Sequence, residues 1–419
     1  MTSLLGFARR ARVKQGRLTR LMTWPSALHL ICRLPAKLSE LDLIGARSHR
    51  PEGRPSAPER IRRRAAVITI GVDAHKAVHV AVALDEAGRE LSAWHGSNSA
   101  AGWQQLLDWA LGLEEERRWG IEGAWGNGRG FAQHLVQREE TVYEINARWT
   151  ALGRRRARKP GKTDGLDARA VALFVRQEAP SLPRVFIEDD TAVLDLLTTE
   201  REAAVTEATR LRNQIHALLL QTDPEYRLKL PSLATRSALE TLRSYVSPNP
   251  GIIQEHRAAS VRRLAQRLQL ALTQAEEVAC QIKSLASSKY EPLTRICGIN
   301  LLTAATLAGI LGPGARFASD AQLAAYAGVA PLEASSAGRA RHRLNRGGNR
   351  RLNSVLYRIV LTQAHYSPEA RAYLDRRVSE GKTRREAHRC LRRYVIRAIW
   401  RLWRECLMTT SCENREVAA

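Results

Sequence analysis

The sequence is poor in acids, paired cysteines and long apolar runs, and each shortage excludes a class of protein. Its 66 Lys+Arg residues outnumber 42 Asp+Glu, which gives a formal net charge of +24 and favours a polyanionic partner. The six cysteines form neither a CxxC pair nor a zinc-ligand spacing. We therefore expect a protein of the reducing cytoplasm in which most of these cysteines act as small apolar residues. No apolar run approaches the roughly 20 residues of a membrane span, and LMTWPSALHLICRL is too interrupted for a signal-peptide core. Nucleic acid is therefore a better candidate partner than a membrane surface.

The length of 419 residues, with 44% hydrophobic and 26% charged residues, indicates a soluble globular chain of two or three domains. Residues 1–64 differ from the rest, because they hold 15 Lys/Arg against 4 acids and show little periodicity. We expect a basic, mostly disordered tail there. A start codon assigned too far upstream would produce the same segment.

Apolar patterning over residues 65–185 predicts an α/β domain. Three runs with β-branched residues or alternation indicate an antiparallel meander, and helices and strands then alternate. This order predicts an RNase H-like (RuvC-like) sheet. The expected strands are 65–73, 76–85, 88–96, 118–126 and 141–147, and the expected helices are 100–116 and 128–137.

Residues 190–290 carry two long runs of apolar residues at helical spacing, which predict a helical coiled-coil hairpin. Such an arm could pack only on itself or also join subunits. A small, mostly α-helical C-terminal domain is expected at 291–405, followed by a tail at 406–419. The turn at Gly298-Ile299 fits either a helix-hairpin-helix that contacts phosphate or an ordinary helix turn.

The C-terminal segment is strongly basic. Residues 331–405 hold 19 Lys/Arg against 6 acids, with Tyr, Trp and His interleaved, and a surface of this kind favours nucleic-acid binding. The expected contacts to nucleic acid are Arg339, Arg341, Arg343, Arg346, Arg350 and, before the paired aspartates, Lys162.

Four acids stand out against this basic background. GKTDGLDARAVA (161–172) places Asp164 and Asp167 on one face of a helix start, and its GKT is no P-loop because Arg156 occupies the position that needs glycine. Asp73 ends the first predicted strand, and Glu122 lies on the strand after the crossover. These two strands are neighbours in an RNase H-like sheet.

Four such carboxylates repel one another unless divalent cations neutralise them, and hard oxygen ligands suit Mg²⁺ or Mn²⁺. Two ions about 4 Å apart could clamp a phosphodiester. His75 and Lys76 follow the first aspartate, where they either contact phosphate or form a solvated strand end.

Three stretches, ITIGVDAHK, GIEGAWGNGRGFAQHL and KTDGLDARAVA, resemble the acidic motifs of the DEDD transposases of the insertion-sequence 110 family. AAYAGVAPLEASSAGRARHRLNRGGNRRLNSVLYRIVLTQA resembles the C-terminal transposase domain of that family, and the matches cover about residues 65–405 in order. The resemblance implies a RuvC-like domain with a metal-binding tetrad. The tetrad would consist of Asp73, Glu122, Asp164 and Asp167.

The resemblance also implies a serine nucleophile that forms a covalent phosphoserine link with DNA. Ser336 matches that serine, and Ser335 is the alternative because Ala337 stands where the family usually has glycine. A site-specific transposase that acts on double-stranded DNA, with a guide RNA from the element, is therefore expected. We expect it to be a homo-oligomer (dimer or tetramer) that is cytoplasmic and associated with the nucleoid. The alternatives are a RuvC-like structure-selective nuclease and an inactive nucleic-acid-binding remnant.

Overall fold

The fold is described from a computed structural model. The described residues are 67–113, 116–147, 149–150, 163–230, 232–233, 235–333, 342–343, 345 and 347–417. The tail predicted for residues 1–64 lies outside them.

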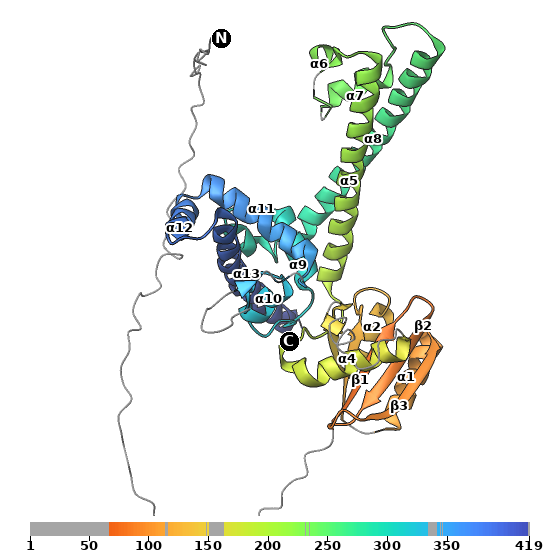
Figure 1. Cartoon of the computed structure of the whole chain (residues 1–419), viewed down its shortest axis with the longest axis vertical. Helices are drawn as coiled ribbons and strands as arrows, with labels where there is room; N and C mark the ends of the chain where they lie inside the picture. The colour runs from red at the N-terminus through yellow and green to blue at the C-terminus, as the bar shows by residue number, and fades with distance from the viewer. Residues whose placement is uncertain are drawn as a thin grey trace, which may run out of the picture. The chain divides into compact units, whose positions relative to one another are not determined.

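A five-stranded mixed sheet forms the N-terminal part (Figure 1). Its order is β3-β2-β1-β4-β5, with β1, β2 and β3 antiparallel to one another and β1, β4 and β5 parallel. The three predicted antiparallel strands are confirmed. The strands are β1 (Ile68–Ala74), β2 (Val78–Leu84), β3 (Glu90–Ser97), β4 (Arg117–Glu122) and β5 (Thr141–Ile145).

Helices cover both faces of this sheet. One face packs on α1 (Ala100–Leu111) and α2 (Arg129–Val136), and the other packs on α4 (Asp164–Glu178). Central strands covered on both sides are expected to be continuously apolar, and all seven residues of β1 are buried.

The close fit of α4 on β1 depends on Gly71. A Cβ atom at this position would stand 2.2 Å from the carbonyl oxygen of Ala168 and 2.3 Å from the backbone nitrogen of Ala172, both on α4. Only glycine allows the two backbones to approach this closely. The contact fixes where α4 lies against the sheet.

The strand predicted at 118–126 is too long, because β4 ends at Glu122. Gly123 takes a φ of 72°, a left-handed conformation that ends the extended strand, and residues 123–128 form turns before α2. The predicted helix at 100–116 is likewise shorter, since α1 ends at Leu111.

Two long helices, α5 (Asp190–Thr222) and α8 (Ile252–Ala286), follow the sheet and pack against each other. They are antiparallel: Leu194 near the start of α5 clusters with Ile282 near the end of α8, and Arg267 binds Glu207 midway at 3.1 Å. The predicted pairing of two helices is therefore confirmed. Between them lie α6 (Tyr226–Lys229) and α7 (Arg236–Arg243).

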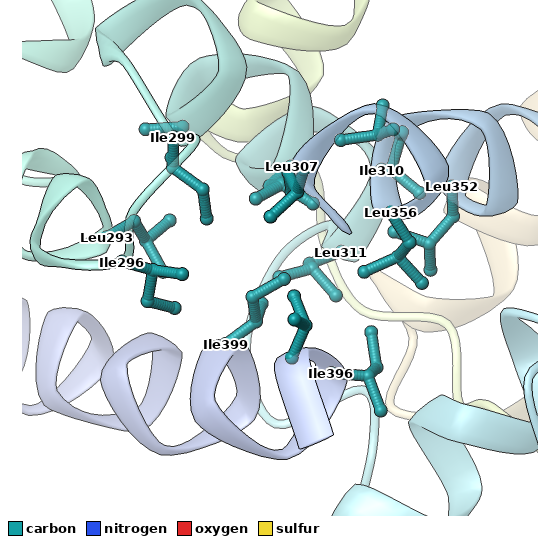
Figure 2. Packing of buried hydrophobic residues seen from close by; sticks show 14 of the residues in the cluster. Leu293, Ile296, Ile299, Leu307, Ile310, Leu311, Leu352, Leu356, Ile396 and Ile399 are labelled. Atoms are coloured by element: carbon teal, nitrogen blue, oxygen red, sulfur yellow. The ribbon is translucent and has the colours of Figure 1, made fainter. Parts of the chain in front are cut away.

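The C-terminal part is helical around one apolar core (Figure 2). Leu307 and Leu311 meet Leu356, Ile396 and Ile399 from other helices. The elements are η2 (Glu291–Arg295), α9 (Leu301–Leu311), α10 (Asp320–Tyr326), a small β-hairpin of β6 (Leu332–Glu333) and β7 (His342–Arg343), α11 (Arg350–Tyr366), α12 (Pro368–Ser379) and α13 (Arg384–Val417).

Two sequence-based expectations change here. The boundary predicted at 405/406 falls inside α13, because the buried Cys406 belongs to the same core. Gly298, at a φ of 89°, turns the chain closely against α11, since a Cβ atom added to it would stand 3.1 Å from the Ile359 carbonyl oxygen. This packing favours an ordinary helix turn. None of the described helices combines the length and apolar composition needed to cross a membrane.

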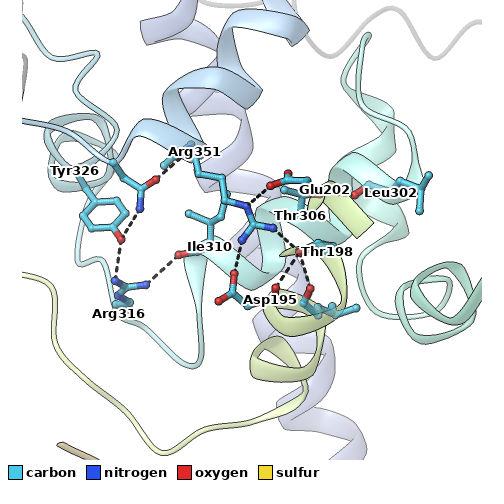
Figure 3. A network of polar contacts seen from close by, with 12 residues as sticks. Asp195, Thr198, Glu202, Leu302, Thr306, Ile310, Arg316, Tyr326 and Arg351 are labelled. Atoms are coloured by element: carbon cyan, nitrogen blue, oxygen red, sulfur yellow. Dashed lines mark hydrogen bonds and ion pairs between the residues drawn. The ribbon is translucent and has the colours of Figure 1, made fainter. Parts of the chain in front are cut away.

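Polar contacts attach this helical part to the preceding elements (Figure 3). Arg351 of α11 binds Asp195 at 2.5 Å, Thr198 at 2.7 Å and Glu202 at 3.0 Å, all on α5. Arg316, after α9, binds Glu144 of β5. These contacts join the C-terminal helices to α5 and to the sheet.

Candidate active site

Asp73 and Glu122 lie side by side at the carboxyl ends of two adjacent parallel strands. They are direct register partners of β1 and β4, as the sequence predicts for neighbouring strands. Asp73 is 6% exposed, and Glu122 is partly buried. The central strands therefore bring together two acids that lie far apart in the sequence.

The other two acids lie in the first turn of α4. The side chain of Thr163 caps the helix by accepting a hydrogen bond from the Leu166 amide at 3.3 Å, so capping requires neither aspartate. Asp167 is 4% exposed, whereas the side chain of Asp164 is 53% exposed. The positive end of the helix dipole favours both carboxylates here.

The electrostatics of Asp73 place all four acids in one cluster. The pKa of Asp73 is raised above its ordinary value, chiefly because burial disfavours the charged form. The nearby charges of Glu122, Asp167 and Asp164 raise this pKa further, while His75 opposes them. A bound cation would relieve this repulsion.

His75 is a member of the cluster that the sequence left undecided. Its Nε2 lies 3.2 Å from Asp73 Oδ2 and 3.5 Å from Asp164 Oδ1. One ligand atom from each of these three residues lies within 4.8 Å of the others, close enough to hold one ion. The only sequence signal was the D-x-H spacing at the strand end. Carboxylates with an imidazole are a donor set that fits a divalent metal.

Thr150 is a residue of the site that the sequence did not indicate. Its buried hydroxyl lies 2.9 Å from Glu122 Oε2 and 3.1 Å from the Ala147 carbonyl oxygen. Its single hydroxyl hydrogen can orient the carboxylate of Glu122 when donated to it. No motif marks Thr150, because the contact spans 28 residues.

The predicted nucleophile and most predicted nucleic-acid contacts lie outside the described residues. Arg343, on β7, and Arg350, the first residue of α11, are described and exposed. The paired strands β6 and β7 flank residues 334–341. Outside the described residues are Ser335, Ser336, Arg339, Arg341, Arg346 and Lys162.

Comparison with known proteins gives matches to both halves of the chain. A family model for IS110-type DEDD transposases, described as Transposase, matches residues 70–224, and one described as Transposase IS116/IS110/IS902 family matches residues 290–375.

The chain is also similar to curated proteins of insertion elements. It is 30% identical over 289 residues to an uncharacterized 43.6 kDa protein of insertion element IS110 from Streptomyces coelicolor, covering 58% of this chain and 71% of the relative. It is 25% identical over 382 residues to an uncharacterized 42 kDa protein of IS900 from Mycobacterium paratuberculosis (80% and 95%). It is 29% identical over 188 residues to the transposase of IS1328 from Yersinia enterocolitica (43% and 52%).

Proposed function

This chain belongs to the IS110 family of DNA transposases, and we propose that its four clustered acids carry the DNA-cleaving step. The observation that supports this most directly is the convergence of Glu122, Asp164 and Asp167 on the buried Asp73. Mg²⁺ or Mn²⁺ bound to these oxygens would polarise a phosphodiester and neutralise developing charge. The protein would orient the ligands, through Thr150 at Glu122 and His75 at Asp73.

We infer that the sheet is of the RNase H-like (RuvC-like) type. The strand order β3-β2-β1-β4-β5, with three antiparallel strands and then two parallel ones, supports this inference. The positions of the acids also support this inference. Asp73 and Glu122 lie at the carboxyl ends of the central strands β1 and β4, and the other two acids lie in the first turn of α4, which covers the sheet. Because one fold can carry many functions, the proposed activity rests on the acidic residues of the site and not on the sheet topology.

The nucleophile of the proposed reaction is Ser336, with Ser335 as the alternative. The serine Oγ would attack phosphorus and lose its proton to a base, while a phosphorus–oxygen bond to the leaving strand breaks. The resulting phosphoserine link conserves the energy of the broken bond, so a second strand's hydroxyl can displace the serine and rejoin the DNA. A free serine hydroxyl is a weak nucleophile and needs such activation.

We propose that an RNA from the element guides the reaction and that the protein acts as a homo-oligomer. The basic C-terminal segment supports binding of a second polyanion besides DNA. For subunit contact, the far part of the α5–α8 hairpin, where α6 and α7 lie, offers exposed apolar side chains. These are Leu228 (86% exposed), Val246 (76%), Ile252 (71%) and Ile253 (64%).

The test is a recombination assay with purified protein, Mg²⁺, the joined element ends, target DNA and RNA transcribed from the flanking non-coding region. Asp73→Asn should abolish cleavage, and Asp85→Asn, at a turn beyond β2, is the matched control that should not. Ser336→Ala and Ser335→Ala are compared for loss of the protein–DNA adduct that survives denaturing electrophoresis.

Each outcome separates the candidates. Loss of adduct and product in one serine variant supports the phosphoserine route and identifies the nucleophile. Cleavage that persists without adduct in both serine variants would instead show a metal-dependent nuclease. Recombination that proceeds equally without RNA would refute guidance, while equal activity of Asp73→Asn and wild type would refute the role of the tetrad.

A further inference from the structure

A concave site lies in the C-terminal helices, apart from the acidic tetrad. The segment 328–331, β7, α12 and α13 enclose a cavity of about 470 Å³. This volume is within the range of small-ligand pockets, roughly 300–1,000 Å³. One acid, Glu386, lines it, against six cations: Arg343, Arg377, Lys382, Arg389, Arg392 and Arg393.

Internal ion pairs account for only part of this positive charge. Arg377 binds Glu380 at 2.7 Å, and Arg393 binds Asp320 at 2.7 Å. Arg389 meets Glu386 at 3.6 Å. Among the described residues, neither Arg343 nor Lys382 has an acidic partner within ion-pair distance, so their charges are available to a bound anion.

Arg392 is a cation whose surroundings do not balance its charge. It donates one hydrogen bond to Asn353 Oδ1 at 2.9 Å and stands over the Tyr357 ring at 5.9 Å. Its buried Nε has no acceptor among the described residues, and the same holds for one terminal nitrogen of Arg393. The pKa of Arg392 is lowered by burial and by the neighbouring charge of Arg389. A bound anion beside the guanidinium would oppose the lowering of this pKa.

An aromatic pair completes the pocket. The rings of Tyr373 and Tyr394 meet edge to face at 5.2 Å and 71°. Tyr394 is 47% exposed, while the Tyr373 hydroxyl accepts a hydrogen bond from Arg377 at 3.1 Å. Cationic donors beside an accessible aromatic ring form the usual combination for binding a nucleotide's phosphate and base.

We propose that this pocket binds one unpaired nucleotide of a DNA strand, with its base against Tyr394 and its phosphate at Arg343, Lys382 and Arg392. A base stacked in a duplex cannot enter a concave pocket, so the nucleotide must be single-stranded or extruded. Only the choice of DNA rests on the proposed function. Arg343 lies on β7, which follows in the sequence the range 334–341 that includes the proposed serine nucleophile.

The test measures binding by full-length protein in EDTA, where neither metal nor serine chemistry contributes. The probes are a fluorescein-labelled oligothymidylate of about 20 nucleotides, which exceeds the usual single-strand site size, a duplex of equal length and the matching oligouridylate. The variants are Tyr394→Ala and the double substitution Arg343→Gln with Lys382→Gln. The controls are Tyr366→Ala, at a ring 70% exposed on α11, and Arg401→Gln, at an exposed position on α13.

Tyr394→Ala should weaken oligothymidylate binding about tenfold, as expected for loss of one base stack, and weaken duplex binding far less. The double variant should reduce the slope of log affinity against log salt by about 1.4, because each lost single-strand phosphate contact removes about 0.7. Oligothymidylate containing iododeoxyuridine should cross-link to Tyr394 under ultraviolet light, as mapped by mass spectrometry. The two control variants lie in the same basic segment but outside the pocket, so each should weaken oligothymidylate binding far less than the pocket variants do.

The proposal would be overturned if the pocket variants lost equal affinity for duplex and single strand, or if they bound oligothymidylate as well as the controls do. It would also be overturned if wild type bound oligouridylate more tightly than oligothymidylate, or if cross-links formed only at residues other than Tyr394. These results are independent of recombination. If the protein is inactive in recombination but Tyr394→Ala still weakens oligothymidylate binding, the pocket proposal stands. If the protein is an active transposase but Tyr394→Ala leaves this binding unchanged, the pocket proposal is wrong.

Discussion

Replacing Glu144 with glutamine should destabilise the chain strongly, because it leaves a buried arginine without its counter-charge. The side chain of Arg316 is 3% exposed, and that of Glu144 is 16% exposed. Arg316 also donates to the Ile310 carbonyl oxygen at 2.9 Å and to the Tyr326 hydroxyl at 3.1 Å (Figure 3). Burial lowers the pKa of Arg316, but Glu144 and Tyr326 together more than offset this, and the pKa ends above its ordinary value.

The expected loss follows from this burial. Glutamine keeps the shape and an oxygen acceptor but removes the charge, and arginine cannot escape by losing its proton. Breaking a buried ion pair by removing one partner costs about 3–5 kcal/mol. The rings of Trp125 and Tyr326, each 5.0 Å from the guanidinium, still stabilise its charge in the variant. The expected loss of stability therefore lies near the lower end of this range, at about 3 kcal/mol.

Urea unfolding followed by far-ultraviolet circular dichroism measures the change in the free energy of unfolding. Glu405→Gln is the matched control, since Glu405 pairs with Arg295 at 3.2 Å on the surface, with side chains 56% and 67% exposed. Exposed pairs contribute about 0–1 kcal/mol. If the two glutamine variants lose equal stability, the argument that burial decides the value of the Arg316–Glu144 pair is refuted.

Three further predictions concern the acidic site. Gly71→Ala should destabilise the fold by about 1–3 kcal/mol or more, because its Cβ would meet the α4 backbone at 2.2 Å; thermal unfolding measures this, and Gly165→Ala, where a Cβ meets nothing within 4 Å, should be close to neutral. In EDTA at neutral pH, Asp73→Asn should be at least as stable as wild type. The reason is that the pKa of Asp73 is raised in the folded state, so its ionised form opposes folding at pH values above its ordinary pKa of 3.8. Mg²⁺ should then raise the Tm of wild type only, and an equal rise in Asp73→Asn would contradict binding at this carboxylate. Thr150→Val should require about tenfold more Mg²⁺ for half-maximal cleavage, because Glu122 loses its hydroxyl partner; Thr209→Val, at an exposed position on α5, should leave the Mg²⁺ titration unchanged.

Local pattern was sufficient to predict the elements that carry the acids. A β-branched apolar run marked β1, and alternation marked β2. The 3,4 spacing marked α5 and α8, because burial of one helix face imposes that period on the sequence. The i,i+3 spacing of Asp164 and Asp167 placed both on one helix face. The end of β4 was predicted four residues late, since the left-handed φ of Gly123 leaves no mark in a run of glycines and apolar residues.

The sequence by itself therefore determined the charge, the order of elements and the positions of the four acids along them. Only the tertiary structure decided what meets those acids. His75 lies between Asp73 and Asp164, and the hydroxyl of Thr150 reaches Glu122, through contacts between segments that no periodicity relates. The same holds for Arg316, which is buried although its local sequence, GPGARFASD, has the composition of an exposed loop. Such contacts depend on how the backbones approach one another, and that approach is fixed by packing across the whole chain rather than by neighbours in sequence.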